Sequence, residues 1–256
     1  MKEKDMTFWE HLDVLRGSLI RIALITVTCG LVAFFFKEKM FDVILAPKDT
    51  GFVTYRLLNE ACNLLGLSFV DDFSVRLINT GLAEQFIIHM KVSICVGFLL
   101  ASPYTLYQVF RFVSPALYAN ERKYSVKIMG WGYVMFACGV LLSYFVIFPL
   151  TFRFLGTYQI SADVDNMIAI QSYMDTFMMM NVVMGIVFEL PVLCWLLARL
   201  RLLNPDSMRR FRKHVVVGIL VVSAIITPTS DVFTLSLVAF PIWLLYEVSI
   251  LIVKRS

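Results

Sequence analysis

Long apolar runs limit this chain to folds in which hydrophobic helices pack together inside a lipid bilayer. Four such runs occupy residues 18–36, 85–113, 128–150 and 173–200. Each has about the 20 residues that a helix needs to cross the hydrocarbon core. A fifth stretch, 215–246, is too long for one span, and the turn-forming residues 227–231 divide it in two. The runs therefore predict an all-α integral membrane protein with six transmembrane helices.

The composition agrees with a membrane protein and offers no sign of catalysis. Hydrophobic residues make up 59% and charged residues 16% of the chain, against about 45–50% and 25% in soluble domains. Five cysteines without a CxxC pair and three scattered histidines predict no metal site and no cofactor. The net charge of +4 comes from short basic clusters beside apolar runs, so no nucleic acid is expected as a partner. We predict that the chain is not an enzyme.

The distribution of Lys and Arg predicts the orientation. Fifteen of these residues fall in one alternate set of connections and six in the other, and the richer set normally faces the cytoplasm. We expect one polytopic membrane domain over 1–256 with both termini cytoplasmic. Residues 1–17 would form a cytoplasmic amphipathic helix and 37–84 an extracytoplasmic cap. The helix over 215–227 would measure only about 20 Å, so the final hairpin should be short.

Polar residues inside the apolar runs are candidates for function. Glu189 lies within the fourth run, where a carboxyl group is costly and is functional by default. An interhelical hydrogen bond with a purely structural role is the alternative. Asn181, two turns earlier, could lie on the same side. His89 and Lys91, near one end of the second run, are expected to extend toward the interface.

Carboxylates also gather on the predicted cytoplasmic face. Glu10 and Asp13 lie near the start of the chain and Glu121 lies in a connection that is otherwise basic. Alone, each would be an ordinary solvated charge. Together they would suit a cationic partner. Asp231 has the position of a cap for the last helix.

Several short motifs, in order and spacing, resemble the TatC family, the core subunit of the twin-arginine protein translocase. The loop motif that ends in Glu121 and Arg122 is the most specific of them. The matching stretches are 11–16, 45–47, 101–103, 106–108, 112–118 with Glu121 and Arg122, 144–145, 148–150, 188–191, 227–228, 231–233 and 245–247.

The resemblance implies a glove-shaped bundle of six helices in a bacterial cytoplasmic (inner) membrane. It implies a receptor for the twin-arginine signal peptides of folded cargo and the core of a translocase driven by the protonmotive force. The partners would be single-span subunits of the TatA and TatB type in an oligomeric complex. The competing hypothesis is an ion-coupled small-molecule transporter with Glu189 as its proton site, although the chain shows no internal repeat.

The resemblance also assigns roles to individual residues. Glu121 matches the glutamate that engages the arginines of the signal, with Glu10, Asp13 and Arg16 as further candidates for the signal-binding site. Glu189 matches an intramembrane glutamate. The remaining matched positions are structural or functional: Pro47, Pro115, Tyr144 and Asp231.

Two positions depart from the family pattern. Val14 stands where the family usually has a glutamate before Leu-Arg, and the nearby acid is Asp13. Leu235 stands where a glutamine usually follows the aspartate motif of the last hairpin. Contacts made through those two family side chains would be absent in this chain.

Overall fold

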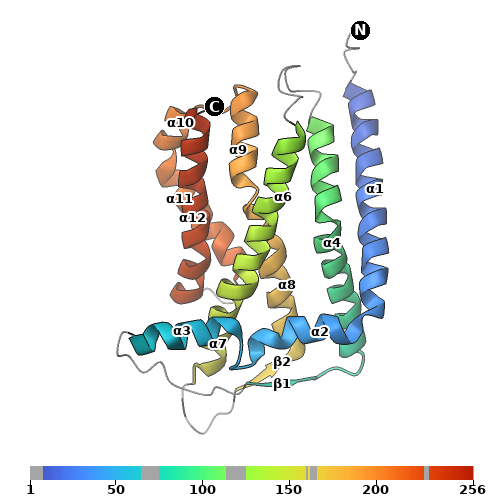
Figure 1. Cartoon of the computed structure of the whole chain (residues 1–256), viewed down its shortest axis with the longest axis vertical. Coiled ribbons are helices and arrows are strands. Elements are labelled where there is room, and N and C mark those ends of the chain that lie inside the picture. Colours follow the sequence, from blue (N-terminus) through green and yellow to red (C-terminus); the bar gives the residue numbers. More distant parts are fainter. Residues whose placement is uncertain are drawn as a thin grey trace.

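The computed structural model describes residues 8–64, 75–113, 125–159, 161, 166–227 and 231–255. It is a bundle of long helices that run roughly parallel, with short elements across one end (Figure 1). The helix α1 begins and α12 ends at what we call the terminal end, and we call the opposite end the cap end. The bundle consists of α1 (Phe8–Phe35), α4 (Glu84–Val113), α6 (Ser125–Leu142), α7 (Phe148–Thr157), α8 (Ile170–Val187), α9 (Leu190–Arg199), α10 (Pro205–Arg210), α11 (Arg212–Ile226) and α12 (Val232–Arg255).

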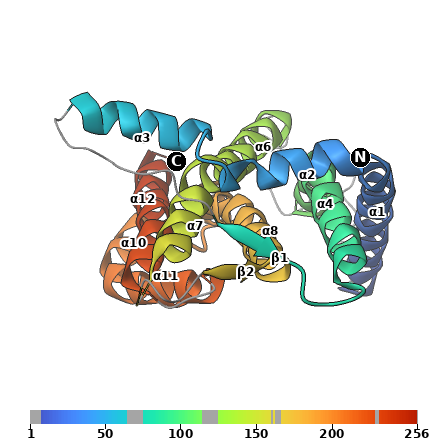
Figure 2. The same ribbon diagram turned by 90° about the horizontal axis from the view of Figure 1, so that it is seen from below.

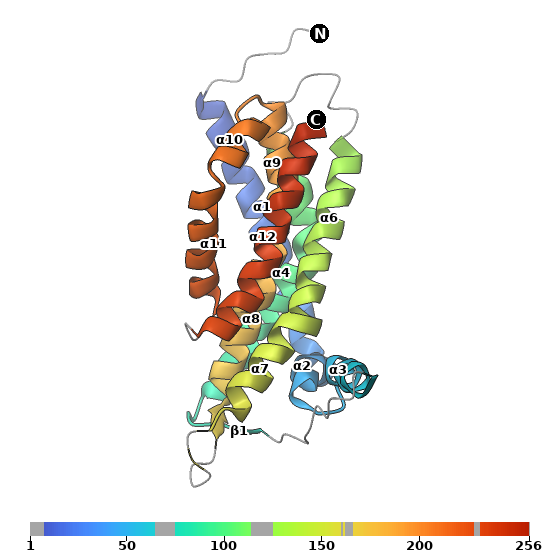
Figure 3. The ribbon, with the colours of Figure 1, turned by 90° about the vertical axis from the view of Figure 1, so that its left-hand side faces the viewer.

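Five helical stretches in the described residues are long and apolar enough to cross a membrane: Leu12–Phe35, Glu84–Phe112, Met129–Thr157, Ile170–Arg199 and Val232–Lys254. They confirm the predicted multi-pass helical fold. The sixth predicted span corresponds to α11, which has 15 residues and a length of about 22 Å. The α11–α12 hairpin turns back before it reaches the cap-end level of α7 and α8 (Figures 1 and 3). The closing hairpin is therefore short, as predicted.

The third span does not close at Pro149, as the sequence suggested. The helix continues from α6 through a wider π-helical turn, η3 (Ser143–Ile147), into α7. Pro149 lies in the first turn of α7, where proline is tolerated. It has no N–H for the carbonyl of Phe145, four residues earlier, and the hydroxyl of Thr54 donates to that carbonyl instead. The helix therefore extends past the proline to Thr157.

A thin layer of short elements forms the cap end. It contains α2 (Lys37–Leu45), the 3₁₀ turn η1 (Ala46–Lys48) and α3 (Val53–Leu64). Seen from below, α2 and α3 follow one side of the bundle (Figure 2). Two short strands that the sequence did not suggest, β1 (Arg76–Ile78) and β2 (Met167–Ala169), pair in parallel with Arg76 opposite Met167.

Glycines let the long helices approach closely. A Cβ on Gly97 of α4 would lie 2.5 Å from the backbone nitrogen of Gly30 in α1. A Cβ on Gly139 of α6 would lie 2.6 Å from the carbonyl oxygen of Met184 in α8. Neither position has room for a side chain. This is how helices associate where the lipid gives no hydrophobic driving force, because small residues allow close backbone packing.

Candidate functional site

A break in the fourth span positions Glu189. The helix α8 ends at Val187 and α9 begins at Leu190, so Glu189 is the residue that precedes α9. Pro191 lies in the first turn of α9 and cannot donate to the carbonyl of Val187, which explains why the helix is interrupted there. The ten residues of α9 put Glu189 about 15 Å from the terminal end of this span, near the middle of the membrane core.

The Glu189 carboxyl group lies against α6 and close to α4. A Cβ on Gly132 of α6 would be 3.2 Å from Oε2 of Glu189 and 3.3 Å from the ring of Phe110 in α4. Glu189 is 8% exposed, and its Oε1 has no hydrogen-bond partner among the described residues. A buried carboxyl oxygen without a partner is costly in a membrane protein. The Glu189 carboxyl group is thus a buried polar group that the described residues leave partly unsatisfied.

Asn181 is buried in α8, but the structure does not join it to Glu189. Its side-chain amide donates to the carbonyl of Phe177, 2.8 Å away in the same helix. The hydrogen bond is thus made within α8, one turn back. Asn181 contributes a buried polar group to the bundle rather than a partner for Glu189.

The candidate signal-binding residues near the start of the chain lie at the terminal end. Asp13 and Arg16 are exposed on the first turns of α1, and Glu10 belongs to the same helix. Glu121 and Pro115 lie outside the described residues. The flanking helices α4 and α6 end and begin at the terminal end (Figure 1), the same end as Asp13 and Arg16.

Pro47 and Tyr144 meet at the cap end. Pro47 has no N–H to donate to the carbonyl of Val43, and the Tyr144 hydroxyl donates to that carbonyl at 2.7 Å. The next carbonyl, of Ile44, accepts a hydrogen bond of 2.8 Å from Tyr173 in α8. Two tyrosines of the bundle thus satisfy the carbonyls that remain free at the end of α2.

Tyr55 ties Pro47 to the third span. The Tyr55 hydroxyl lies 3.0 Å from the carbonyl oxygen of Pro47 and 2.9 Å from that of Pro149, and its one proton is shared between them. Burial raises the pKa of the Tyr55 phenol well above its ordinary value, so the hydroxyl keeps its proton and remains a donor. Pro47 is therefore a structural residue that fixes the cap on the bundle.

Asp231 caps α12, as predicted. Its Oδ2 accepts a hydrogen bond of 2.7 Å from the backbone N–H of Thr234. The Thr234 hydroxyl also donates to the same carboxylate. These bonds satisfy a free donor in the first turn of α12. The polar group of Thr234 is thereby used inside the hairpin, and the neighbouring Leu235 offers no polar contact.

Of two polar residues near the cap end, one has a partner that the sequence did not suggest and one is placed differently from the prediction. Lys91 of α4 forms an ion pair with Asp175 of α8, with 3.2 Å between Nζ and Oδ1. His89 is buried rather than extended to the interface, and its ring stacks on Phe34 at 4.0 Å and meets the edge of Phe41 at 5.8 Å. The partners come from other helices, so spacing along one helix gave no signal for them.

No group of three or more His, Cys, Asp or Glu residues that could hold a metal is found in the described part of the chain. All five cysteines are free thiols. The site therefore consists of one buried carboxyl at a helix break, exposed charges at the terminal end and a cap held by tyrosines. A multi-pass helical bundle with these features belongs to the class of membrane transport proteins.

Comparison with known proteins gives the family. Residues 10–241 match the family described as Sec-independent protein translocase protein (TatC). A protein of that name from Blattabacterium is 31% identical, covering 98% of this chain and 96% of its own length. One from Aquifex aeolicus is 32% identical with the same coverage. A crystal structure of the twin-arginine translocase receptor TatC superposes with a TM-score of 0.78 at 31% identity, over 96% of this chain and 99% of that one.

The chain therefore belongs to the TatC family of Sec-independent protein translocase proteins. This confirms the resemblance drawn from the motifs. It also confirms that the chain is a translocase component and not an enzyme. Protein translocation is favoured over small-molecule transport.

Proposed function

We propose that this chain binds the twin-arginine signal peptides of folded cargo proteins and forms the core of a translocase that exports them with the protonmotive force. The observation that carries the proposal is the full-length likeness to a structure described as a twin-arginine translocase receptor. The site adds two chemical features that suit this role. These are the exposed carboxylate of Asp13 at the terminal end and the buried carboxyl of Glu189 at mid-membrane.

Recognition of the signal begins at the terminal end. Two arginines present planar guanidinium groups that stay charged at physiological pH, and a carboxylate can accept one of them through two parallel hydrogen bonds. Glu121 is the main candidate. Glu10, Asp13 and Arg16, which the predicted topology places on the same side of the membrane, are further candidates. Pro115 restricts the backbone ahead of Glu121.

The second step takes place along the membrane-embedded face. The apolar part of a signal peptide would pack on the helices near Glu189, whose Oε1 has no partner among the described residues. A buried acceptor without a partner favours a ligand that supplies a donor. Asn181 adds to the polarity of α8 but acts through its own helix.

The complex would also contain single-span subunits of the TatA and TatB type and more than one copy of this chain. Exposed apolar side chains of α11, Val217, Val221 and Ile225, leave a surface for such a helix. We place the protein in the cytoplasmic (inner) membrane of a bacterium with both termini in the cytoplasm. The support is the excess of Lys and Arg in the connections at the terminal end.

A binding experiment tests this function. The full chain in detergent is titrated with a fluorescent signal peptide that carries the Arg-Arg pair, and with a matched peptide in which both arginines are lysine. We expect binding to the first at least tenfold tighter than to the second, because Lys cannot form the bidentate pair. Equal affinity for the two peptides would contradict the proposal.

A further inference from the structure

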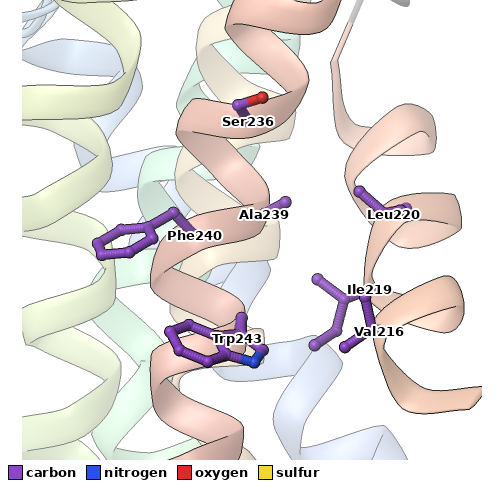
Figure 4. Close-up of a pocket in the computed structure, with 7 residues that line it drawn as sticks. All are labelled: Val216, Ile219, Leu220, Ser236, Ala239, Phe240 and Trp243. Atoms are coloured by element: carbon purple, nitrogen blue, oxygen red, sulfur yellow. The ribbon is translucent and has the colours of Figure 1, made fainter. Parts of the chain in front are cut away.

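A narrow apolar groove lies between α11 and α12. Its volume is about 230 Å³. Figure 4 shows Ile219 of α11 and Ala239 of α12 pointing toward each other across it, with Trp243 at about the level of Val216. The only polar side chain among its seven lining residues is that of Ser236. The lining residues are Val216, Ile219, Leu220, Ser236, Ala239, Phe240 and Trp243.

An ion pair joins α11 and α12 one helical turn beyond the groove, toward the terminal end. Arg212 and Glu247 lie four residues from Val216 and Trp243, so each pair of residues shares one helix face. The Arg212 guanidinium and the Glu247 carboxylate are 2.6 Å apart and join α11 to α12. The groove is therefore apolar, with charged residues one turn beyond it.

Beyond this ion pair, the surface is strongly basic. Arg209, Arg210 and Lys213 are exposed around the start of α11. From 199 to 213 the chain has six basic residues and a single acid, Asp206. Glu247 offsets the charge of Arg212, which leaves the other basic residues to attract an anion at the mouth of the groove.

We propose that this groove binds one acyl chain of an anionic phospholipid, whose phosphate lies among Arg209, Arg210 and Lys213. The apolar groove would hold the acyl chain, and the basic residues beyond it would hold the phosphate. The lining spans 216–220 of α11 and 236–243 of α12, about 6 and 10 Å of rise. This length holds part of one acyl chain, but not a transmembrane helix of roughly 20 residues. The proposal does not depend on signal-peptide binding.

Trp243 provides a reporter inside the groove. The full chain with Trp9→Phe, Trp131→Phe and Trp195→Phe keeps Trp243 as its single tryptophan. It is reconstituted in phosphatidylcholine vesicles that contain a small fraction of lipid brominated on the acyl chain. The lipid is either phosphatidylglycerol or phosphatidylcholine. Because bromine quenches indole fluorescence on contact, quenching measures how often each lipid occupies the groove.

We expect the brominated phosphatidylglycerol to be preferred about fivefold or more, the effect of roughly one basic residue near an anionic headgroup. The preference should fall to within twofold when Arg209, Arg210 and Lys213 are replaced by Gln. The matched triple variant Lys37→Gln, Lys39→Gln and Lys48→Gln, which removes as much charge at the cap end, should keep it. A chain whose single tryptophan is the membrane-exposed Trp131 should show no preference.

A salt titration tests the electrostatic origin of the preference without a charge variant. It can therefore be used even if the basic triple variant does not fold. At 1 M NaCl, where charges are screened beyond about 3 Å, the preference should largely disappear. Equal quenching by both lipids at low salt would overturn the proposal, because it would mean ordinary contact with bulk lipid. Absence of quenching by either lipid would also overturn it, because acyl chains would then not enter the groove.

Discussion

The Tyr144 hydroxyl donates to the backbone carbonyl of Val43, the one carbonyl of α2 that Pro47 leaves without a donor. The same solution occurs within the second span, where Ser102 donates to the carbonyl of Leu99, four residues before Pro103, at 2.7 Å. In a membrane protein each free backbone carbonyl away from water is costly. Prolines can therefore shape this bundle because hydroxyl groups supply the hydrogen bonds that they remove.

The tyrosines at the cap end should contribute measurably to stability. We expect Tyr173→Phe to lower the free energy of unfolding by about 1–3 kcal/mol, because it leaves a buried carbonyl, that of Ile44, unsatisfied. Tyr144→Phe should cost less, since its acceptor Val43 is 57% exposed. Thermal unfolding in detergent measures both. Tyr133→Phe, on an exposed part of α6, is the control and should have no effect. A negligible loss of stability in all three variants would contradict a role for Tyr144 and Tyr173 in holding the cap.

The Lys91–Asp175 ion pair should show coupling between α4 and α8. Both side chains are nearly half exposed, so the pair is worth about 0–1 kcal/mol. Lys91→Asp or Asp175→Lys alone should lower the unfolding temperature, because each puts like charges together. The double exchange should restore most of the loss. If the loss in the double variant equals the sum of the two single losses, Lys91 and Asp175 are not coupled and the contact has no energetic role.

Apolar length and charge distribution were enough to predict the long helices, because a bilayer demands about 20 apolar residues per span. The cap of Asp231 on α12 also followed from local chemistry. The sequence did not predict correctly where a helix ends near a proline. The helix passes Pro149 because Thr54, from a distant segment, donates to the freed carbonyl, and no local pattern encodes that donor.

For the site, the sequence identified Glu189 as a costly buried carboxyl, but not its neighbours. Gly132 and Phe110 come from two other spans, and periodicity along one helix does not report which spans meet. The same reason explains why the burial of His89 against Phe34 was missed. The parallel strands β1 and β2 have three residues each, too short to give a period-2 pattern.

The orientation in the membrane can be tested by labelling. In a cysteine-free background, Arg56→Cys on α3 and Ser207→Cys on α10 both place an exposed thiol, at opposite ends of the bundle. A membrane-impermeant maleimide added to intact cells should modify position 56 and spare position 207. Permeabilised cells, where both should react, control for reactivity. The reverse pattern would invert the topology.

Glu121 should carry much of the affinity for the arginine pair. Hydrogen bonds to charged groups contribute about 1.5–3 kcal/mol. The sequence predicts a cytoplasmic loop here, which would put the pair at the low end because water and salt screen it. Glu121→Ala should therefore weaken binding of an Arg-Arg signal peptide about tenfold, with normal membrane insertion. Glu121→Asp should be partly active and Glu121→Arg inactive. Wild-type affinity in Glu121→Ala, measured by titration in detergent, would remove this residue from the recognition site.

Variants of Glu189 can distinguish an effect on stability from an effect on export. Its Oε1 has no hydrogen-bond partner among the described residues, so removing the carboxyl group deletes an unsatisfied buried acceptor and should not destabilise the fold through a lost contact. We expect Glu189→Ala to unfold at or above the wild-type temperature in detergent while export of a folded reporter protein falls. Glu189→Gln keeps a carbonyl acceptor of the same shape and should retain most of the export. Pro191→Ala, two residues along the same helix break, is a control for damage to the backbone. Full export by Glu189→Ala would leave this carboxyl without a role in transport. A large drop in its unfolding temperature would instead make Glu189 a structural residue.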